Sequence, residues 1–272
     1  MFRLLAFDLD DTLLAPDGTL SARTVAALTA MHNRGVVIAL ASGRMLPTML
    51  PIAEALPFAP ALVSYNGAQV NLSSQTPPLY HCPLPAALSG RVLDLAKARH
   101  LHLNFYHDDR LFVTDISDWK ARIYQQQTGA HLELEPDIET FRGLSPTKII
   151  VIDEAGRIAD LLADCREIFH GELTLTRSKP IYLEFLHPSV DKGEGFKALC
   201  NALEIPLEET AAFGDAYNDI EMLQAAGTAV AVENAIAEVK AIADVICPSN
   251  NDDGVAQVLE QWLEQDLKDE AG

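Results

Sequence analysis

The chain has 272 residues and a net charge of −19, from 39 acidic and 20 basic side chains. This charge argues against nucleic acid or an anionic membrane surface as a partner, since both require basic patches. Aspartates interrupt the N-terminal apolar run too early for a signal peptide, and no apolar run is long enough to span a bilayer. The four cysteines do not have the spacing of metal ligands. We therefore expect a cytoplasmic protein with reduced thiols, long enough for two domains.

The first 80 residues alternate short apolar runs with helical patterns. The runs at 3–7, 36–40 and 61–67 predict buried strands, and helices are expected after Ser21 and over 45–55. Strands that alternate with helices in this way predict a parallel sheet with right-handed crossovers. Ligands of such sheets bind beyond the carboxyl ends of the strands, so we expect the site residues at those ends.

The pattern changes after about residue 80, where four prolines mark a hinge or linker. Two strands around Asp108-Asp109 have the pattern of an antiparallel hairpin, and the segment as a whole predicts an α+β insert. The elements expected in the insert are helices 86–99, 117–127 and 157–169, and strands near 102–107, 110–114, 148–152, 172–176 and 181–186.

The alternation of strands and helices resumes after about residue 187. The fold class predicted for the chain is therefore α/β, with a Rossmann-like, doubly wound parallel-sheet core over 1–83 and 188–272 and an inserted α+β domain over 84–187. The elements expected in this last part are helices 192–203, 216–225, 235–241 and 253–267, and strands 210–213, 228–232 and 244–246.

The first strand ends in Asp8-Leu9-Asp10-Asp11-Thr12. Because side chains alternate along an extended chain, we expect Asp8, Asp10 and Thr12 on one side. Two carboxylates at one sheet edge repel each other unless a cation or a hydrogen-bond donor lies between them, and an oxygen-rich pair of this kind suits Mg²⁺. A solvated turn would contain the same residues, so this segment alone is ambiguous.

A second acidic segment, Gly-Asp-Ala-Tyr-Asn-Asp, occupies residues 214–219. Asp215 stands where a strand ends, and a helix starting at Ala216 would bring Asn218 and Asp219 close to it. The alternative is that Asp215 and Asp219 only cap the helix and favour its dipole. Capping explains one of the acids but not the whole group.

Two further segments carry polar groups that suit an anion. Ser42-Gly43-Arg44 follows a strand and offers a hydroxyl, an unhindered N–H and a helix N-terminus, which together can bind a phosphate, although a plain helix cap would look the same. Lys192 lies in a first helical turn, where it opposes the dipole unless it meets an anion. The alternative is an exposed lysine paired with Asp191 or Glu194.

Taken together, these segments resemble the haloacid dehalogenase superfamily of phosphohydrolases. Its four motifs match DLDDT (8–12), ASGR (41–44), DKG (191–193) and GDAYND (214–219). The SYNGA turn at 64–68 and the insert between the second and third motifs are similar to the Cof-like branch, which carries a class IIB cap. The chain departs from the pattern at Asp11, where glycine is frequent, and at Ala41, where threonine is usual.

The resemblance implies a Mg²⁺-dependent phosphatase of small phosphorylated metabolites. Asp8 would be the nucleophile that forms an aspartyl-phosphate, and Asp10 would be the general acid and then the general base. Mg²⁺ would be bound by the Asp8 carboxylate, the backbone carbonyl of Asp10, Asp215 and, through water, Asp219. The phosphoryl oxygens would be bound by the side chains of Ser42, Lys192 and Asn218 and by the N–H groups of Leu9 and Gly43.

As a cap, the insert would select the leaving group by closing over the site. A phosphomutase of hexose phosphates and a non-enzymatic, receiver-like module that is phosphorylated on aspartate are the alternatives. The sequence does not decide whether the substrate is a sugar phosphate, a flavin mononucleotide-type cofactor or pyridoxal phosphate. It does not decide the oligomeric state either. Candidates for substrate contact are Arg44, Tyr106, Lys148, Tyr182, Glu184 and His187, although side chains of this kind more often belong to the cap core or the solvated surface.

Overall fold

The computed structural model describes residues 2–271, with side chains up to residue 265. These residues form two compact units. The core unit comprises residues 2–43, 49–80 and 191–271, and the insert unit comprises 44–48 and 81–190. Among the described residues, no helix combines the length and the apolar character needed to cross a bilayer.

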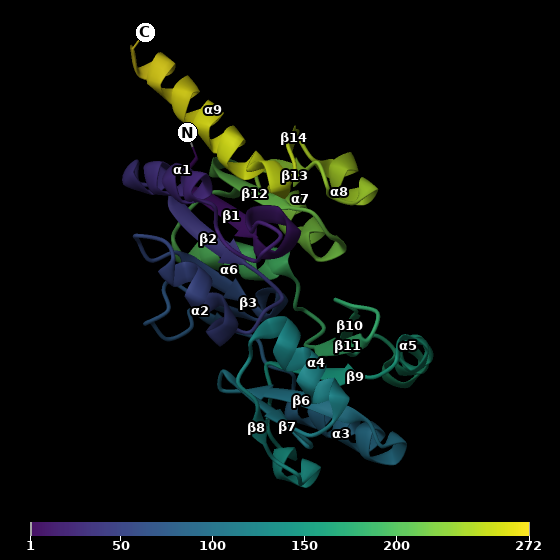
Figure 1. The fold of residues 1–272 in the computed structure, drawn as a ribbon. Helices are drawn as coiled ribbons and strands as arrows, with labels where there is room; N and C mark the ends of the chain where they lie inside the picture. Colours follow the sequence, from purple (N-terminus) through teal and green to yellow (C-terminus); the bar gives the residue numbers. More distant parts are fainter. Residues whose placement is uncertain (1, 272) are drawn as a thin grey trace. The chain divides into compact units, whose positions relative to one another are not determined.

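The core unit contains an eight-stranded sheet in the order β14-β13-β12-β1-β2-β3-β4-β5. Figure 1 labels its strands from β14 to β3. Neighbouring strands from β14 to β3 are parallel, and β4 runs antiparallel to β3. Central strands such as β1 and β12 are buried along their whole length, as strands covered on both faces must be. The strands are β1 (Leu4–Asp8), β2 (Val37–Ala41), β3 (Ala61–Ser64), β4 (Gln69–Asn71), β5 (Tyr80–His81), β12 (Thr210–Gly214), β13 (Thr228–Val232) and β14 (Val245–Cys247).

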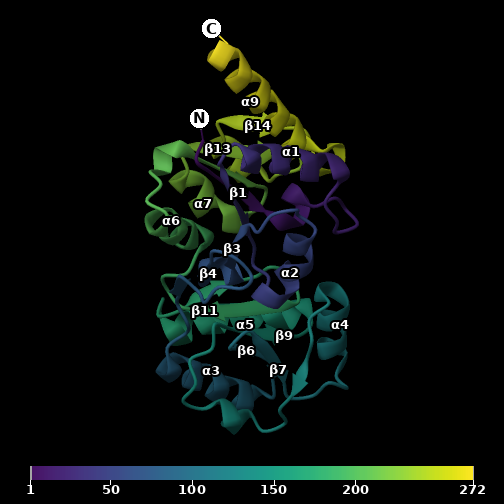
Figure 2. The ribbon, with the colours of Figure 1, turned by 90° about the vertical axis from the view of Figure 1, so that its left-hand side faces the viewer.

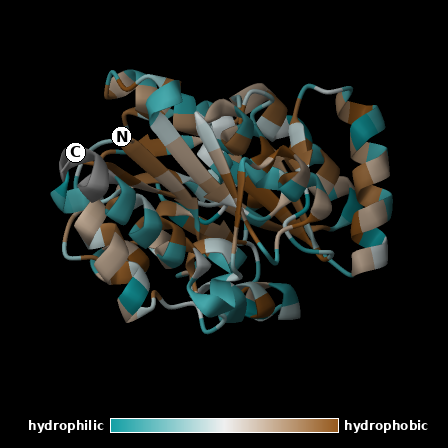
Figure 3. Ribbon diagram, turned by 90° about the horizontal axis from the view of Figure 1, so that it is seen from above, coloured by the Kyte–Doolittle hydropathy of each residue, from teal (hydrophilic) through white to brown (hydrophobic). Residues whose placement is uncertain are grey.

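Helices cover both faces of this sheet. Helix α1 packs against α9 and α6 against α7, and Figure 2 shows the two pairs on opposite sides of the strands. The cap expected at Ser21 is present, since its side chain accepts a hydrogen bond from Thr24 N at 3.0 Å. Hydrophobic residues are concentrated in the strands (Figure 3). These helices are α1 (Ala22–Asn33), α2 (Leu46–Glu54), α6 (Lys192–Ala202), α7 (Ile220–Ala225), α8 (Ala237–Ile242) and α9 (Gly254–Ala271).

The predicted doubly wound α/β core is confirmed, but the sheet is not wholly parallel. Strands β4 and β5 were not expected. Tyr65 and Asn66 both have positive φ, 53° and 55°, so the chain reverses tightly after β3 and returns beside it as β4. A local reversal of this kind leads to antiparallel pairing, whereas a helical crossover leads to parallel pairing.

The insert unit has its own six-stranded sheet, in the order β10-β11-β9-β6-β7-β8. All neighbours are antiparallel except β7 and β8. The predicted hairpin turns at Asp108 and Asp109, both with positive φ, whereas β8 was not expected. The elements are α3 (Ala86–Arg99), β6 (His102–His107), β7 (Arg110–Val113), α4 (Trp119–Thr128), β8 (Glu133–Leu134), β9 (Lys148–Ile152), α5 (Ala155–Phe169), β10 (Thr174–Thr176) and β11 (Tyr182–Leu186).

One face of the insert sheet forms the hydrophobic core of this unit. Alternate strand residues such as Phe105, Val151 and Phe185 pack with apolar residues of α3 and α5. The opposite face carries polar residues at the intervening positions, among them Tyr106 and Glu184. This alternation has the period of two that strand geometry requires.

Candidate active site

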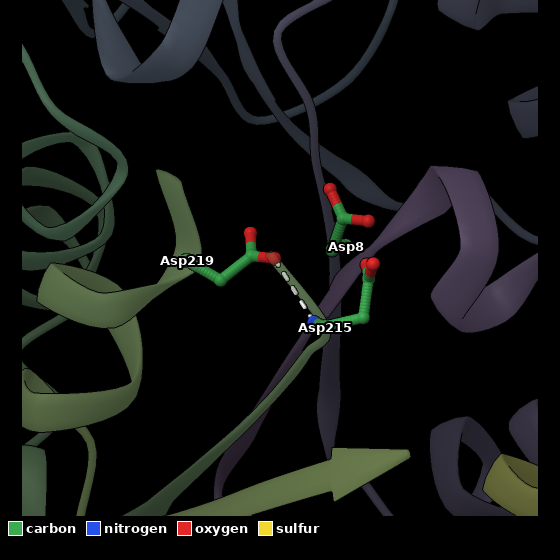
Figure 4. A group of neighbouring side chains, drawn as sticks. All are labelled: Asp8, Asp215 and Asp219. Atoms are coloured by element: carbon green, nitrogen blue, oxygen red, sulfur yellow. Dashed lines mark hydrogen bonds between the residues drawn. The ribbon is translucent and has the colours of Figure 1, made fainter. Parts of the chain in front are cut away.

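Three aspartates meet at the carboxyl edge of the core sheet. Asp8 is the last residue of β1, Asp215 follows β12, and Asp219 lies one turn further along. Each offers a carboxylate oxygen, and these oxygens lie within 4.8 Å of one another. Figure 4 shows the three side chains pointing toward one another. They meet because β1 and β12 are parallel neighbours whose carboxyl ends reach the same edge.

Lys192 lies among these carboxylates. Its Nζ donates to Asp8 Oδ1 and, at 2.5 Å, to Asp219 Oδ1. The Lys192 side chain is fully buried, so the alternative of an exposed lysine paired with Asp191 or Glu194 is wrong. Asp191 instead caps helix α6 by accepting from Glu194 N at 2.8 Å. A lysine in a first helical turn does indeed meet anions here.

Three acids share one lysine, and the pKa values reflect this imbalance. Burial raises the pKa of Asp8 well above its usual value, repulsion from Asp219 adds to this, and Lys192 opposes it. Burial likewise raises the pKa of Asp215 to about 6, against a hydrogen bond from Thr12. Burial alone would lower the pKa of Lys192, but the carboxylates of Asp219 and Asp8 raise it. The lysine therefore stays charged, and the cluster can accommodate a further cation.

The donor set fits Mg²⁺, a hard cation that prefers carboxylate oxygens. Asp219 is the most heavily engaged of the three acids, because its Oδ2 accepts from the N–H groups of Asp215 (3.0 Å) and Ala216 (2.9 Å) while Oδ1 accepts from Lys192. Its main structural role is thus to fix the loop after β12 and to pair with the lysine. Asp8 and Asp215 are the better placed direct ligands.

The segment after Asp8 does not continue as an extended strand, so the alternation from which Asp8, Asp10 and Thr12 were expected on one side does not apply to it. Leu9–Leu13 forms a wide helical turn closed by a hydrogen bond from Leu14 N to Leu9 O at 2.9 Å. The turn leaves Asp8 buried and Asp10 exposed. Thr12 is turned toward the acidic cluster and donates its hydroxyl to Asp215 Oδ1 at 2.8 Å.

The helix expected from Ala216 is also different in detail. Tyr217–Asp219 forms a single 3₁₀ turn, and α7 begins only at Ile220. This turn places Asp219 back toward the end of β12. Gly214 makes the approach possible, because a Cβ there would lie 2.6 Å from the Cβ of Asp219.

A second group of polar residues adjoins the carboxyl end of β2. Ser42 is buried, and its carbonyl accepts from Asn66 N at 3.0 Å. Asn66 Oδ1 in turn accepts from Asn218 Nδ2 at 3.1 Å. A Cβ on Gly43 would lie 2.9 Å from the same Oδ1, so a larger residue there would have to displace the Asn66 side chain. The structure thus brings the expected phosphate-binding residues of two loops together through Asn66.

Asn66 is a site residue that sequence reasoning did not identify. The sequence feature that points to it is the Asn-Gly dipeptide within SYNGA at 64–68, which is typical of a turn with positive φ. The dipeptide predicts the reversal of the chain but not the direction of the asparagine side chain, which depends on how β3 aligns with β2.

A family model described as haloacid dehalogenase-like hydrolase matches residues 5–259. The chain belongs to this family. A protein of Yersinia pseudotuberculosis named HMP-PP phosphatase is 31% identical over 266 residues, which cover 97% of this chain and 96% of that protein. The resemblance to the Cof-like phosphatases is thereby confirmed, and the hydrolase is an enzyme of the phosphoric monoester hydrolase class rather than a receiver-like module.

Solved structures of similar proteins agree with the fold of the hydrolase. A Thermotoga maritima protein is 30% identical with a TM-score of 0.89, covering 96% of this chain and 97% of its own. A haloacid dehalogenase-like hydrolase from Bacteroides thetaiotaomicron is 27% identical with a TM-score of 0.89, covering 96% and 99%.

In the insert unit of the hydrolase, three of the substrate-contact candidates form one buried cluster. Lys148 Nζ donates to Glu184 Oε2 at 2.8 Å, and both side chains are about 3% exposed. Glu184 Oε1 also accepts from the hydroxyl of Ser178. The Lys148 ammonium lies 5.2 Å from the centre of the Tyr106 ring, within range of a cation–π interaction.

The other candidates lie in different surroundings. The Tyr182 hydroxyl donates to Gln127 Oε1 at 2.6 Å. His187 Nδ1 accepts from Ser189 N at 3.1 Å, so this histidine stabilises the chain where the insert unit ends. Arg44 belongs to the insert unit; burial raises the pKa of Tyr124, and the charge of Arg44 weakly opposes this shift.

Proposed function

We propose that this hydrolase is a Mg²⁺-dependent phosphatase of small phosphorylated metabolites that works through an aspartyl-phosphate on Asp8. The observation that carries the proposal is the excess of carboxylates over cations at the end of β1 and β12. Asp8, Asp215 and Asp219 surround the single ammonium of Lys192, so a divalent cation would neutralise the cluster. A buried carboxylate at a strand end is also well placed to attack a ligand at that edge of the sheet.

In the first step, Asp8 supplies the nucleophile. One carboxylate oxygen attacks phosphorus while the bond from phosphorus to the leaving oxygen breaks. Lys192 stabilises the negative charge of the phosphoryl group, because its ammonium lies against Asp8 and can donate to a phosphoryl oxygen. Asp219 keeps Lys192 in that position.

Asp10 moves the protons. It donates one to the leaving oxygen as the alcohol departs, and in the second step its carboxylate removes one from the water that attacks the aspartyl-phosphate. Water then leaves as part of inorganic phosphate, and Asp8 is restored. Exposure of Asp10 beside buried Asp8 suits this role, because an acid that exchanges protons with water must be accessible.

The phosphoryl oxygens are bound by groups from three loops. Ser42 and the N–H of Gly43 follow β2, Asn218 follows β12, and the N–H of Leu9 opens the turn after Asp8. Asn66 fixes the spacing of the first two loops by bonding to both.

Mg²⁺ would be bound by Asp8, Asp215 and the backbone carbonyl of Asp10, with Asp219 acting through water. When bound, it would offset the repulsion between the nucleophile and the phosphoryl oxygens. Thr12 orients Asp215 toward this position by donating to its Oδ1.

The proposal extends to the division of labour along the chain. Residues 1–83 and 188–272 would form the phosphohydrolase core, and 84–187 the cap that selects the leaving group. Arg44, Tyr106 and Glu184 are the proposed substrate contacts. The support for this division is the resemblance to the Cof-like branch with its class IIB cap, together with the polar cluster around Glu184.

The test is release of inorganic phosphate from a panel of phosphorylated metabolites, with Mg²⁺ and with a chelator. The panel includes sugar phosphates, flavin mononucleotide, pyridoxal phosphate and, because of the named Yersinia relative, HMP-PP. We expect Mg²⁺-dependent release from at least one compound. Interconversion of hexose phosphates with little free phosphate would instead favour a phosphomutase, and equal activity with the chelator would contradict the metal dependence.

A further inference from the structure

The turn that carries Asp10 has an unfavourable backbone. We call residues 9–14 the Asp10 turn. Asp10 is nearly extended, with φ −74° and ψ 128°, and Asp11 is left-handed, with φ 61°. A left-handed aspartate is uncommon and persists only where its surroundings determine it. Asp10 is exposed, and its Cα is part of this turn, so the backbone of the turn sets the point from which its carboxylate extends.

Two asparagines from distant loops bond to this backbone. Asn234, two residues after β13, donates from Nδ2 to Asp11 O at 2.7 Å. Asn250, three residues after β14, donates from Nδ2 to Leu14 O at 2.9 Å. One bond therefore reaches the left-handed residue next to Asp10, and the other reaches the end of the turn.

The two asparagines are also joined to each other. Asn250 N donates to Asn234 Oδ1 at 3.2 Å. Asn250 is 8% exposed, and its Oδ1 accepts from the hydroxyl of Ser249 at 3.2 Å. Both carboxamides thus have their orientation fixed from two sides, and neither side chain can rotate without breaking a contact.

The loop that contains Asn234 is connected to the acidic cluster as well. Ile236 N donates to Asp215 O at 2.9 Å. One short loop therefore bonds both to the backbone of the Asp10 turn, at Asp11, and to the backbone of Asp215.

We infer that Asn234 and Asn250 are positioning residues that fix Asp10 for proton transfer by bonding to the carbonyls of Asp11 and Leu14. This inference rests on the proposed function of Asp10. Neither asparagine was singled out by the sequence, and neither contacts Asp8 or Lys192 through the bonds described. We refer to the pair as the asparagine latch.

A loosened latch should affect some substrates much more than others. An alkyl phosphoester has a basic leaving oxygen that must receive the Asp10 proton as its bond to phosphorus breaks. Nitrophenolate leaves without that proton, because it is a stable anion. Poor positioning of Asp10 therefore slows the attack of Asp8 on an alkyl phosphoester and leaves its attack on p-nitrophenyl phosphate nearly unchanged.

The experiment compares Asn234→Ala, Asn250→Ala and the double variant with the wild type. The substrates are p-nitrophenyl phosphate and the alkyl phosphoester of the panel that the wild type hydrolyses fastest. For Asn234→Ala we expect kcat/KM to fall about tenfold for the alkyl ester and less than about twofold for the aryl ester, since general acid catalysis contributes about 10²–10⁴-fold in full. Because the two asparagines are joined, the double variant should lose less than the product of the single losses.

Asn251→Ala is the matched control. Asn251 is exposed in the same turn as Asn250, and the bond it makes to Ser249 Oγ comes from its backbone N–H, which alanine retains. We expect this variant to behave as the wild type with both substrates. An equal fall of the two kcat/KM values in Asn234→Ala would overturn the latch, because it would indicate a general structural defect.

Amide hydrogen exchange gives a readout that is independent of turnover. We expect exchange in residues 9–14 to become about tenfold faster in Asn234→Ala, while residues 4–8 of β1 stay as protected as in the wild type. Unchanged exchange across residues 9–14 would overturn the inference even if activity fell. A wild type that hydrolyses no phosphoester would overturn the proposed function alone, and the exchange measurement would still decide whether the asparagines fix the turn.

Discussion

Each unit of this hydrolase buries a lysine beside carboxylates, and the two sites differ in charge balance. In the insert unit, Lys148 pairs with Glu184, and the pair is neutral. In the core unit, Lys192 faces Asp8 and Asp219, with Asp215 close by, so that the site is short of positive charge. Both lysines are almost completely inaccessible to water.

The difference in charge balance favours the core site, rather than the insert site, for the proposed cation. A buried ion pair that is balanced and fully hydrogen-bonded has no need of a further partner. Glu184 is in this position, because Lys148 and Ser178 both donate to it. Asp8 is not, since burial and its acidic neighbours raise its pKa despite Lys192. The raised pKa reflects this excess of negative charge, which supports the proposed binding of a metal ion there.

The largest expected effect follows from removing the nucleophile. Asp8→Asn keeps an oxygen that can accept from Lys192 but cannot form the aspartyl-phosphate. We expect turnover to fall by about four orders of magnitude or more, as for other catalytic nucleophiles. The melting temperature should stay close to that of the wild type, because one of three mutually repelling carboxylates is neutralised. A variant that released phosphate at near wild-type rate would refute the role of Asp8.

Removal of the lysine from the unbalanced site comes next. For Lys192→Met we expect a loss of about 10²–10³ in kcat, the range found when one donor to a developing negative charge is removed. Mg²⁺ should raise the melting temperature of this variant more than that of the wild type, because the three acids then have no internal cation. Lys197→Met is the control, since Lys197 pairs with Glu194 at the surface. Equal effects of the two substitutions would contradict the comparison.

For the balanced pair the expected effect is on stability. Lys148→Met leaves Glu184 buried with one donor fewer. The substitution should lower the free energy of unfolding by about 3 kcal/mol, because it leaves a buried charge without its compensating partner. Lys148→Met with Glu184→Leu should recover most of that loss. Urea unfolding measures both. Lys97→Met, in an exposed pair with Glu139, should change stability by less than about 1 kcal/mol.

The smallest expected effect is the pH dependence of metal stabilisation. The pKa of Asp215 is raised from 3.8 to about 6 by burial, so the folded protein binds this proton more tightly than the unfolded chain. Without metal, the contribution of Asp215 to stability therefore falls as pH rises from about 4 to 6. Mg²⁺ competes with the same proton, so its stabilisation should be small at pH 5 and complete above pH 7.

At pH 7.5 and 100 times the dissociation constant, the stabilisation by Mg²⁺ should reach about 2.7 kcal/mol. Melting temperatures with Mg²⁺ and with a chelator, at pH 5 and at pH 7.5, test this expectation. Asp215→Asn should lose most of the difference between the two pH values. A wild type that Mg²⁺ stabilises equally at both would contradict the raised pKa.

The sequence predicted the strand ends well because a physical rule applies to them. Parallel strands buried on both faces are recognisable as apolar runs, and their carboxyl ends share one edge. The sequence alone therefore predicts one sheet edge for three of the site residues, Asp8, Asp215 and Ser42. Lys192 was predicted as a site residue because the positive charge of a lysine at the start of a helix is unfavourable with the helix dipole unless an anion lies nearby.

The parts that were missed depend on turns. Asp10 was expected beside Asp8 on an extended chain, whereas the backbone leaves that conformation at Leu9. Asn66, Asn234 and Asn250 are ordinary loop asparagines in the sequence. What they bond to is decided by which strands become neighbours and by single positive-φ residues, and a one-dimensional pattern contains neither.

The pairing of β1 with β12 has a consequence for the order in which this protein matures. Leu4 is in register with Thr210, so β1 leaves the ribosome long before β12 and lacks one of its two neighbours until β12 has been synthesised. Lys192, Asp215 and Asp219 also emerge late. A nascent chain that ends before them cannot assemble the acidic cluster, so tight binding of a divalent ion would report that translation has passed β12 and that β12 has paired with β1.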